Sequence, residues 1–199
     1  MGNRTADLPE LSGLAHLIRE MRYHEFSRQA IGIVLLAVFV IWASPRPEMF
    51  WVGAVIALLG ILVRLYASGF VMKNKELATD GPYAFVRHPL YTGNILMLVG
   101  FCLANGQIWP WFVGAFFLWF WYPTAISYED NKLERIFDDS WRAWSANTPA
   151  LMPRRVSGNQ SSENHWSFIK SMRQNWEPVI VVYSLVCLWW LWKQLPFAG

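Results

Sequence analysis

The stretch Phe50–Val71, which reads FWVGAVIALLGILVRLYASGFV, decides the fold class. A membrane-spanning helix needs about 20 apolar residues, and this stretch is that long with one charged side chain, Arg64. The whole chain of 199 residues is 54% hydrophobic and contains 13 Trp and 13 Phe, which is more than soluble domains usually carry. The sequence therefore predicts an all-α integral membrane protein with a single domain, residues 1–199.

Further apolar runs lie on both sides of this stretch. They cover residues 31–44, 90–104, 108–126 and 178–195. Two of them are short for a membrane span, and we expect their flanks to extend them. The connections PRPEM and NGQ are short enough to favour antiparallel helical hairpins. The sequence thus predicts a bundle of about five transmembrane helices, of which 178–195 is the last.

The basic residues predict how this bundle is oriented. Of the 17 Lys and Arg, 14 lie in segments that share one side of the membrane if every run spans it. Because cytoplasmic loops are enriched in Lys and Arg, we expect a multi-pass protein with its N-terminus in the cytoplasm. The net charge of +3 is explained by this topology and by membrane lipids with anionic headgroups, so no nucleic acid partner is expected.

Residues 1–30 are predicted to contain an amphipathic helix that lies at the membrane surface. Its apolar positions follow the spacing i, i+3, i+4 and i+7, with arginines mostly on the other side. These apolar positions are Leu14, Leu17, Ile18 and Met21.

The motif GPYAFVRHPLYTGN, residues 81–94, places polar side chains where a cytoplasmic loop enters the apolar run 90–104. Pro89 suits the first turn of a helix, because its missing N–H has no partner there. The free N–H groups at the start of a helix attract anionic groups such as carboxylates, and Arg87 and His88 add donors at the same point. This segment therefore predicts a binding site.

Two acids follow the run 108–126 on the same side of the membrane. Glu129 and Asp130 are the first acids after a long uncharged stretch, and a connection of three residues makes the two runs neighbours. We expect Arg87 and His88 to face them across roughly one helix-packing distance, 8–10 Å. A pocket with cations on one side and carboxylates on the other suits a zwitterion, such as the head group of an amino acid.

Of the reactive residues inside the apolar runs, one is a candidate for chemistry. Arg64 lies roughly 10 Å inside its run, and an intramembrane arginine is functional by default. We expect it to line the active-site cavity, with Glu129, Asp130 or a bound carboxylate as its partner. Cys102 and Cys187 behave as small apolar groups at such positions, so neither a disulfide nor a metal site is expected.

The segments ELATDGPYAFVRHPLYTGN, EDNKLERIFDDSWRAW and TPALMPR together resemble the superfamily of isoprenylcysteine carboxyl methyltransferases and phospholipid methyltransferases. The resemblance covers residues 64–154 and implies that they form the core that binds S-adenosylmethionine. It is carried by an Arg-His-Pro-x-Tyr-x-Gly motif and by an acid pair that Leu133 and Phe137 follow. The chain departs from the family pattern at Asp130 in place of Glu, at Asp138 in place of Gly, and at Trp141 and Trp144 in place of Tyr.

The resemblance implies a methyltransferase with a cytoplasmic active site and a lipid or another lipophilic small molecule as acceptor. The acceptor atom, oxygen, nitrogen or sulfur, and the oligomeric state stay open. The residues expected to bind the cofactor are Gly81, Tyr83, His88, Pro89, Tyr91, Gly93, Glu129 and Asp130. The residues expected to be catalytic are Arg64, Arg87 and Glu129.

Two other functions compete with this one. Membrane sterol reductases have a related helical fold and a similar Arg-His motif but use NADPH, and Pro89 after His88 favours the methyltransferases. A membrane scaffold without enzymatic activity is the second alternative, and Asp130 and Asp138 are the departures that favour it. Binding of each cofactor to the purified protein would separate the two enzymes.

Overall fold

The computed structural model describes residues 12–71, 76–153, 166–173 and 176–196. Within these ranges the chain forms helices and no β-strand, so the prediction of an all-α fold is confirmed. The elements are α1 (Gly13–Tyr23), α2 (Glu25–Ile41), α3 (Pro47–Ser68), the 3-10 helix η1 (Gly81–Ala84), α4 (Pro89–Asn105), α5 (Trp109–Ser145), α6 (Phe168–Arg173) and α7 (Glu177–Lys193). The apolar runs lie in α2, α3, α4, α5 and α7.

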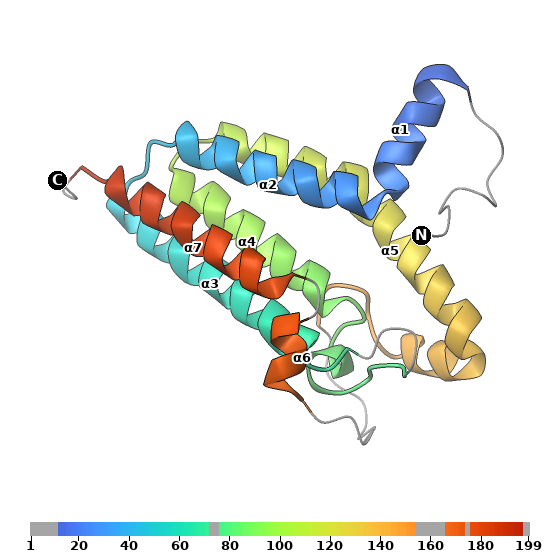
Figure 1. Ribbon diagram of the computed structural model, residues 1–199. Coiled ribbons are helices and arrows are strands. Elements are labelled where there is room, and N and C mark those ends of the chain that lie inside the picture. Colours follow the sequence, from blue (N-terminus) through green and yellow to red (C-terminus); the bar gives the residue numbers. More distant parts are fainter. Residues whose placement is uncertain (1–11, 72–75, 154–165, 174–175, 197–199) are drawn as a thin grey trace.

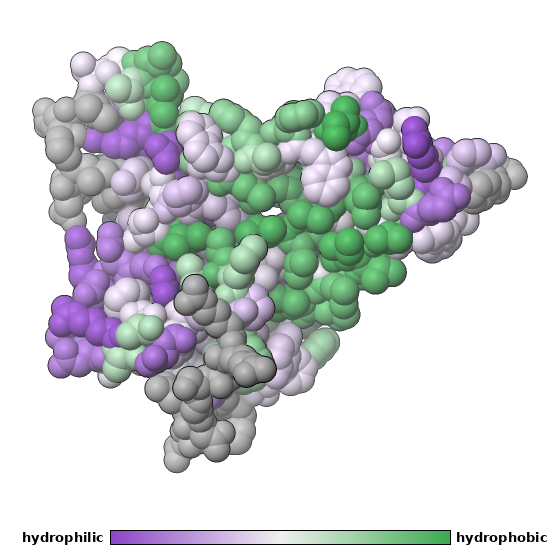
Figure 2. All heavy atoms as spheres, turned by 180° about the vertical axis from the view of Figure 1, so that it is seen from behind, coloured by the Kyte–Doolittle hydropathy of each residue, from purple (hydrophilic) through white to green (hydrophobic). Residues whose placement is uncertain are grey.

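The helix α3 is long and apolar enough to cross a membrane on its own. The helices α1 and α2 would add a second candidate only if the pair, which is bent by 80°, formed one span. Figure 2 shows a broad hydrophobic band across the molecule, with hydrophilic residues gathered at its two ends. The arrangement with five spans stays a prediction.

The centre of the fold is a close contact between α3 and α4, with α7 alongside both helices (Figure 1). Glycines make this approach possible, because a Cβ atom on Gly100 would lie 2.5 Å from the nitrogen of Ala57 and 2.6 Å from the oxygen of Gly53. A Cβ atom on Gly60 would lie 2.6 Å from the oxygen of Gly93. Small residues of this kind are typical where helices pack in membranes.

The helix α5 extends well beyond the apolar run that was expected to end at Ile126. It continues to Asp138, whose φ of 41° and ψ of −113° break the helix, and a further segment runs to Ser145. Such a conformation favours glycine, the residue of the family pattern at this position, and Asp138 adopts it here. The break lets the chain turn back, so that residues 148–151 reach the start of α4.

The N-terminal segment differs in part from the prediction. The helix α1 is amphipathic, and its apolar residues Leu14, Leu17 and Ile18 are exposed, but it ends at Tyr23 and the chain bends before α2. Its position at a membrane surface stays a prediction. Residues 1–11 of that segment, and residues 154–165, lie outside the described residues.

Candidate functional site

The Arg-His-Pro motif lies against the segment that follows α5. The backbone N–H of Arg87 donates to the carbonyl of Pro149 at 2.8 Å, and that of His88 donates to Ala150 at 3.0 Å. The helix α4 begins at Pro89, as predicted. The hydroxyl of Thr92 in its first turn donates to the carbonyl of Leu151 at 3.0 Å. Residues 149–151, which follow α5, therefore hold the motif in place at the start of α4.

Asp130 on α5 pairs with both cations of the motif. Its carboxylate lies 3.0 Å from Nη2 of Arg87, and its Oδ1 atom lies 2.9 Å from Nε2 of His88. Arg87 also donates from Nη1 to the carbonyls of Thr148, at 2.7 Å, and Ser145, at 3.3 Å. The motif and the acid were expected to face each other across a helix-packing distance, but they touch. Asp130 and the backbone carbonyls at and after the end of α5 thus hold Arg87, and Asp130 also holds His88.

Glu129 is engaged far less than its neighbour Asp130. Its Oε2 atom lies 3.6 Å from Nδ1 of His88, and 48% of its side chain is exposed, against 15% for Asp130. The ring of Tyr91 stacks on the imidazole of His88 with centroids 5.5 Å apart. Glu129 is therefore the carboxylate of this pair that is open to a ligand.

His88, Glu129 and Asp130 stabilise one another's charged forms. Burial lowers the pKa of His88, but the hydrogen bonds and charges of Asp130 and Glu129 outweigh it, so the pKa of His88 is raised. Desolvation raises the pKa of Glu129 and of Asp130, but other contacts outweigh it and both pKa values are lowered. At Glu129 the largest of these contacts is with His88. At Asp130 they are the contacts with His88 and Arg87. The imidazolium form of His88 suits its position, because each ring nitrogen faces a carboxylate.

We expect His88 to titrate above 6.5, its ordinary pKa. Because the folded-state pKa is raised, this contribution to stability is present below about 6.5 and is lost as the pH rises through the folded-state pKa. NMR titration of protein with labelled histidines measures the midpoint, and His88→Gln identifies the signal. Asp130→Asn should lower the midpoint, and an unchanged midpoint would contradict the assigned cause.

Arg64 has a partner that the sequence reasoning missed. Its guanidinium forms a bidentate pair with Glu177 on α7, with Nη2 to Oε1 at 2.7 Å and Nε to Oε2 at 3.2 Å. Ser68 donates to the same carboxylate at 2.9 Å, and Nη1 of Arg64 donates to Oδ1 of Asn94. The expectation that Glu129 or Asp130 neutralises Arg64 was therefore wrong.

Two functional contacts were missed from the sequence, the pair of Arg64 with Glu177 and the contact of Arg28 with Tyr91. Glu177 is the last acid of the chain and directly precedes the apolar run 178–195. Arg28 is a basic residue that lies three residues before the apolar run 31–44. In the structure its guanidinium lies over the ring of Tyr91, 5.1 Å from the centroid.

The remaining predicted residues pack around the motif. Gly81, with a φ of 56°, begins η1, and the ring of Phe70 would clash with a Cβ atom there. Tyr83 is buried, and this burial raises the pKa of its hydroxyl. Gly93 faces Arg64, because a Cβ atom on Gly93 would lie 2.6 Å from Cγ of Arg64. These three residues shape the surroundings of the site.

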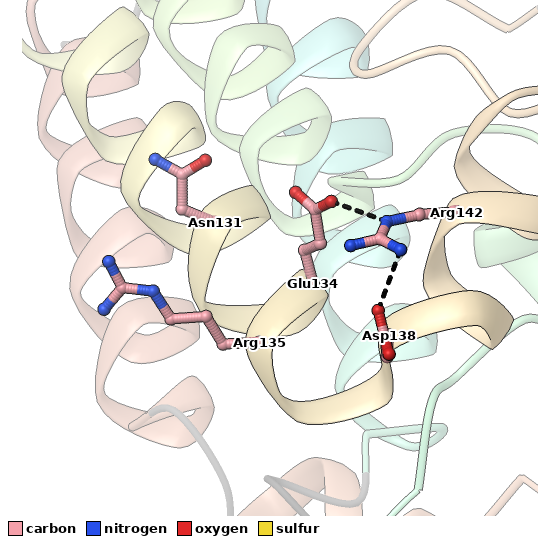
Figure 3. Close-up of a pocket in the computed structure, with 5 residues that line it drawn as sticks. All are labelled: Asn131, Glu134, Arg135, Asp138 and Arg142. Atoms are coloured by element: carbon pink, nitrogen blue, oxygen red, sulfur yellow. Dashed lines mark hydrogen bonds and ion pairs between the residues drawn. The ribbon is translucent and has the colours of Figure 1, made fainter.

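A separate polar hollow lies along α5, next to its break at Asp138 (Figure 3). Arg142 spans it, 2.9 Å from Glu134 and 3.0 Å from Asp138, while Arg135 points away from these ion pairs. The lining residues are Asn131, Glu134, Arg135, Asp138 and Arg142. None of the predicted site residues lines the hollow, so it is distinct from the candidate site. Exposed ion pairs of this kind contribute little to stability.

Comparison with known proteins identifies the relatives of this chain. The family model for phospholipid methyltransferase matches residues 47–140. The protein-S-isoprenylcysteine O-methyltransferase of Schizosaccharomyces pombe is 31% identical over 83 residues, which are 41% of this chain and 35% of that protein. This match covers about a third of that enzyme.

Two proteins named for metal resistance match over more of the chain. The nickel-cobalt-cadmium resistance protein NccN of Alcaligenes xylosoxydans xylosoxydans is 30% identical over 159 residues, covering 74% of this chain and 72% of that protein. The cobalt-zinc-cadmium resistance protein CzcN of Cupriavidus metallidurans is 31% identical over 144 residues, covering 64% and 65%. No solved structure matches the chain.

Proposed function

Because the chain belongs to the superfamily of isoprenylcysteine carboxyl methyltransferases and phospholipid methyltransferases, we propose that it is an S-adenosylmethionine-dependent methyltransferase with a lipophilic acceptor. When bound, the cofactor supplies the methyl group on its sulfonium. Transfer of this group needs little acid–base chemistry, and its main requirements are alignment of the acceptor and exclusion of water. The protein then has to bind and orient both molecules.

The observation that carries the proposal is the position of Glu129. Its carboxylate is ionised near neutral pH because its pKa is lowered, it is half exposed, and it lies 3.6 Å from the imidazole of His88. An anionic oxygen of this kind fits the ammonium group of an amino acid head. We assign the contact with the cofactor to Glu129, and we assign to Arg87 and Asp130 the positioning of the motif.

We further propose that the apolar surface contacts lipid, with five spans and the site on the cytoplasmic side. Large apolar side chains on α3 and α7 are exposed over much of their length, and contact with lipid would cover them. They include Trp51, Val52, Val55, Leu58, Leu59 and Leu62 on α3, and Val179, Val182, Leu185 and Val186 on α7. A lipophilic acceptor would reach the site from this apolar surface.

Transfer of label from S-adenosylmethionine tests the proposal. Membranes that contain the protein are incubated with the cofactor, labelled in its methyl group, and with a lipid extract from the cell. We expect a labelled lipid product, and chemical analysis then shows whether oxygen, nitrogen or sulfur carries the label. Glu129→Gln should reduce the rate at least about tenfold, because the loss of a charged hydrogen bond costs about 1.5–3 kcal/mol.

Glu134→Gln is the matched control, because Glu134 lies on the same helix and pairs with Arg142 in the polar hollow. Its rate should stay near that of the wild type. Binding of NADPH without binding of S-adenosylmethionine would favour the reductase. Binding of S-adenosylmethionine without a product from any lipid would favour the scaffold.

A further inference from the structure

Arg28 on α2 differs from the other cations near the site, because no described carboxylate pairs with it. Glu177 neutralises Arg64 in a bidentate pair, and Asp130 together with two backbone carbonyls engages Arg87. No carboxylate among the described side chains lies within 4.0 Å of the Arg28 guanidinium. Arg28 is half-buried over the ring of Tyr91, 5.1 Å from its centroid.

Glu129 lies next to the same tyrosine. Arg28 is close enough to Glu129 to contribute to the lowering of its pKa, although the two do not form an ion pair. A cation from α2 and a carboxylate from α5 therefore adjoin one aromatic ring of α4, each with unused hydrogen-bonding capacity. In an α-amino acid the ammonium and carboxylate groups share one carbon, so a site for it needs opposite charges this close together.

We propose that Arg28 binds the carboxylate of the cofactor's methionine moiety while Glu129 binds its ammonium group. This inference rests on the proposed function. It adds α2 to the cofactor site and gives His88, which contacts both residues, the task of holding Glu129 and Tyr91 in place. The planar guanidinium offers paired N–H donors that match a carboxylate.

Two ligands that differ only in the carboxylate test this assignment. One is S-adenosylhomocysteine, and the other is its decarboxylated analogue, which keeps the ammonium group. Isothermal titration calorimetry on the full chain in detergent should show that Arg28→Gln weakens S-adenosylhomocysteine about tenfold to a hundredfold. The same substitution should leave the affinity for the analogue close to that of the wild type.

Arg22→Gln is the matched control, because Arg22 also lies over an aromatic ring, 5.2 Å from the centroid of Phe120, but it donates to a backbone carbonyl away from the site. It should change neither affinity. Arg28→Lys keeps the charge without the planar group and should give an intermediate loss for S-adenosylhomocysteine alone.

Equal weakening of both ligands by Arg28→Gln would overturn the assignment, because it would show a structural role for the cation–π contact. Unchanged affinity for both ligands would overturn it as well. If the wild type binds neither ligand, the proposed function fails together with the inference. If the wild type binds both ligands and Arg28→Gln binds them equally well, the proposed function stands and only the role of Arg28 is rejected.

Discussion

Replacement of Glu177 by Leu is expected to lower the free energy of unfolding by about 3–5 kcal/mol. Glu177 is fully buried, and its carboxylate accepts three hydrogen bonds, two from Arg64 and one from Ser68. The substitution leaves the Arg64 guanidinium buried without a counter-charge, and desolvation of an unpaired ion is costly. Chemical unfolding of the protein in detergent micelles measures the difference.

The double variant Arg64→Leu with Glu177→Leu distinguishes the cost of leaving one buried charge unpaired from the net contribution of the ion pair to the free energy of unfolding. Because it removes both ions, it should recover most of the lost stability. Arg64→Leu alone leaves the Glu177 carboxylate buried without its counter-charge and should be nearly as harmful. If the double variant is as unstable as either single one, packing rather than charge explains the loss.

Gly100→Ala is expected to lower the free energy of unfolding by about 1–3 kcal/mol. The added methyl group would lie 2.5 Å from the nitrogen of Ala57 and 2.6 Å from the oxygen of Gly53. Both atoms belong to the backbone of α3, so no side chain can move aside and the two helices must separate. This cost opposes the gain of about 1 kcal/mol that Ala normally brings to the interior of a helix.

Gly32→Ala on α2 is the control for this substitution. Its added methyl group would meet only the ring of Phe117, at an ordinary contact distance of 3.6 Å. The control gains the same helix propensity without the clash and should be at least as stable as the wild type. Unfolding free energies that rise equally in both variants would contradict the close contact between α3 and α4.

The sequence predicted the helices well because the apolar runs are continuous and lack the strict apolar–polar alternation of a half-buried β-strand. The start of α4 at Pro89 and the meeting of the motif with Asp130 follow from local rules, a proline in the first turn and a short hairpin. What failed was the pairing of Arg64. Its partner Glu177 is 113 residues away, and hydrophobic periodicity says nothing about which residues of distant helices meet.

The different roles of the two acids at the site could not be predicted from the sequence either. Glu129 and Asp130 are adjacent acids, and only the geometry of α5 decides that one is engaged by Arg87 and His88 while the other stays half exposed. The break at Asp138 returns residues 148–151 to the motif, and a helical pattern in the sequence does not reveal it. Whether the predicted residues bind the cofactor stays a prediction.

The distance along the chain between Arg64 and Glu177 has a consequence for biosynthesis. A ribosome that adds about 5–20 residues per second makes Glu177 roughly 6–23 s after Arg64, because 113 residues separate them. During this interval the nascent chain holds a cation without its counter-charge, and the position of Arg64 one turn before the end of α3 lets its long side chain reach polar surroundings. The ion pair forms only once α7 has been made, so a chain interrupted before Glu177 keeps Arg64 without its counter-charge.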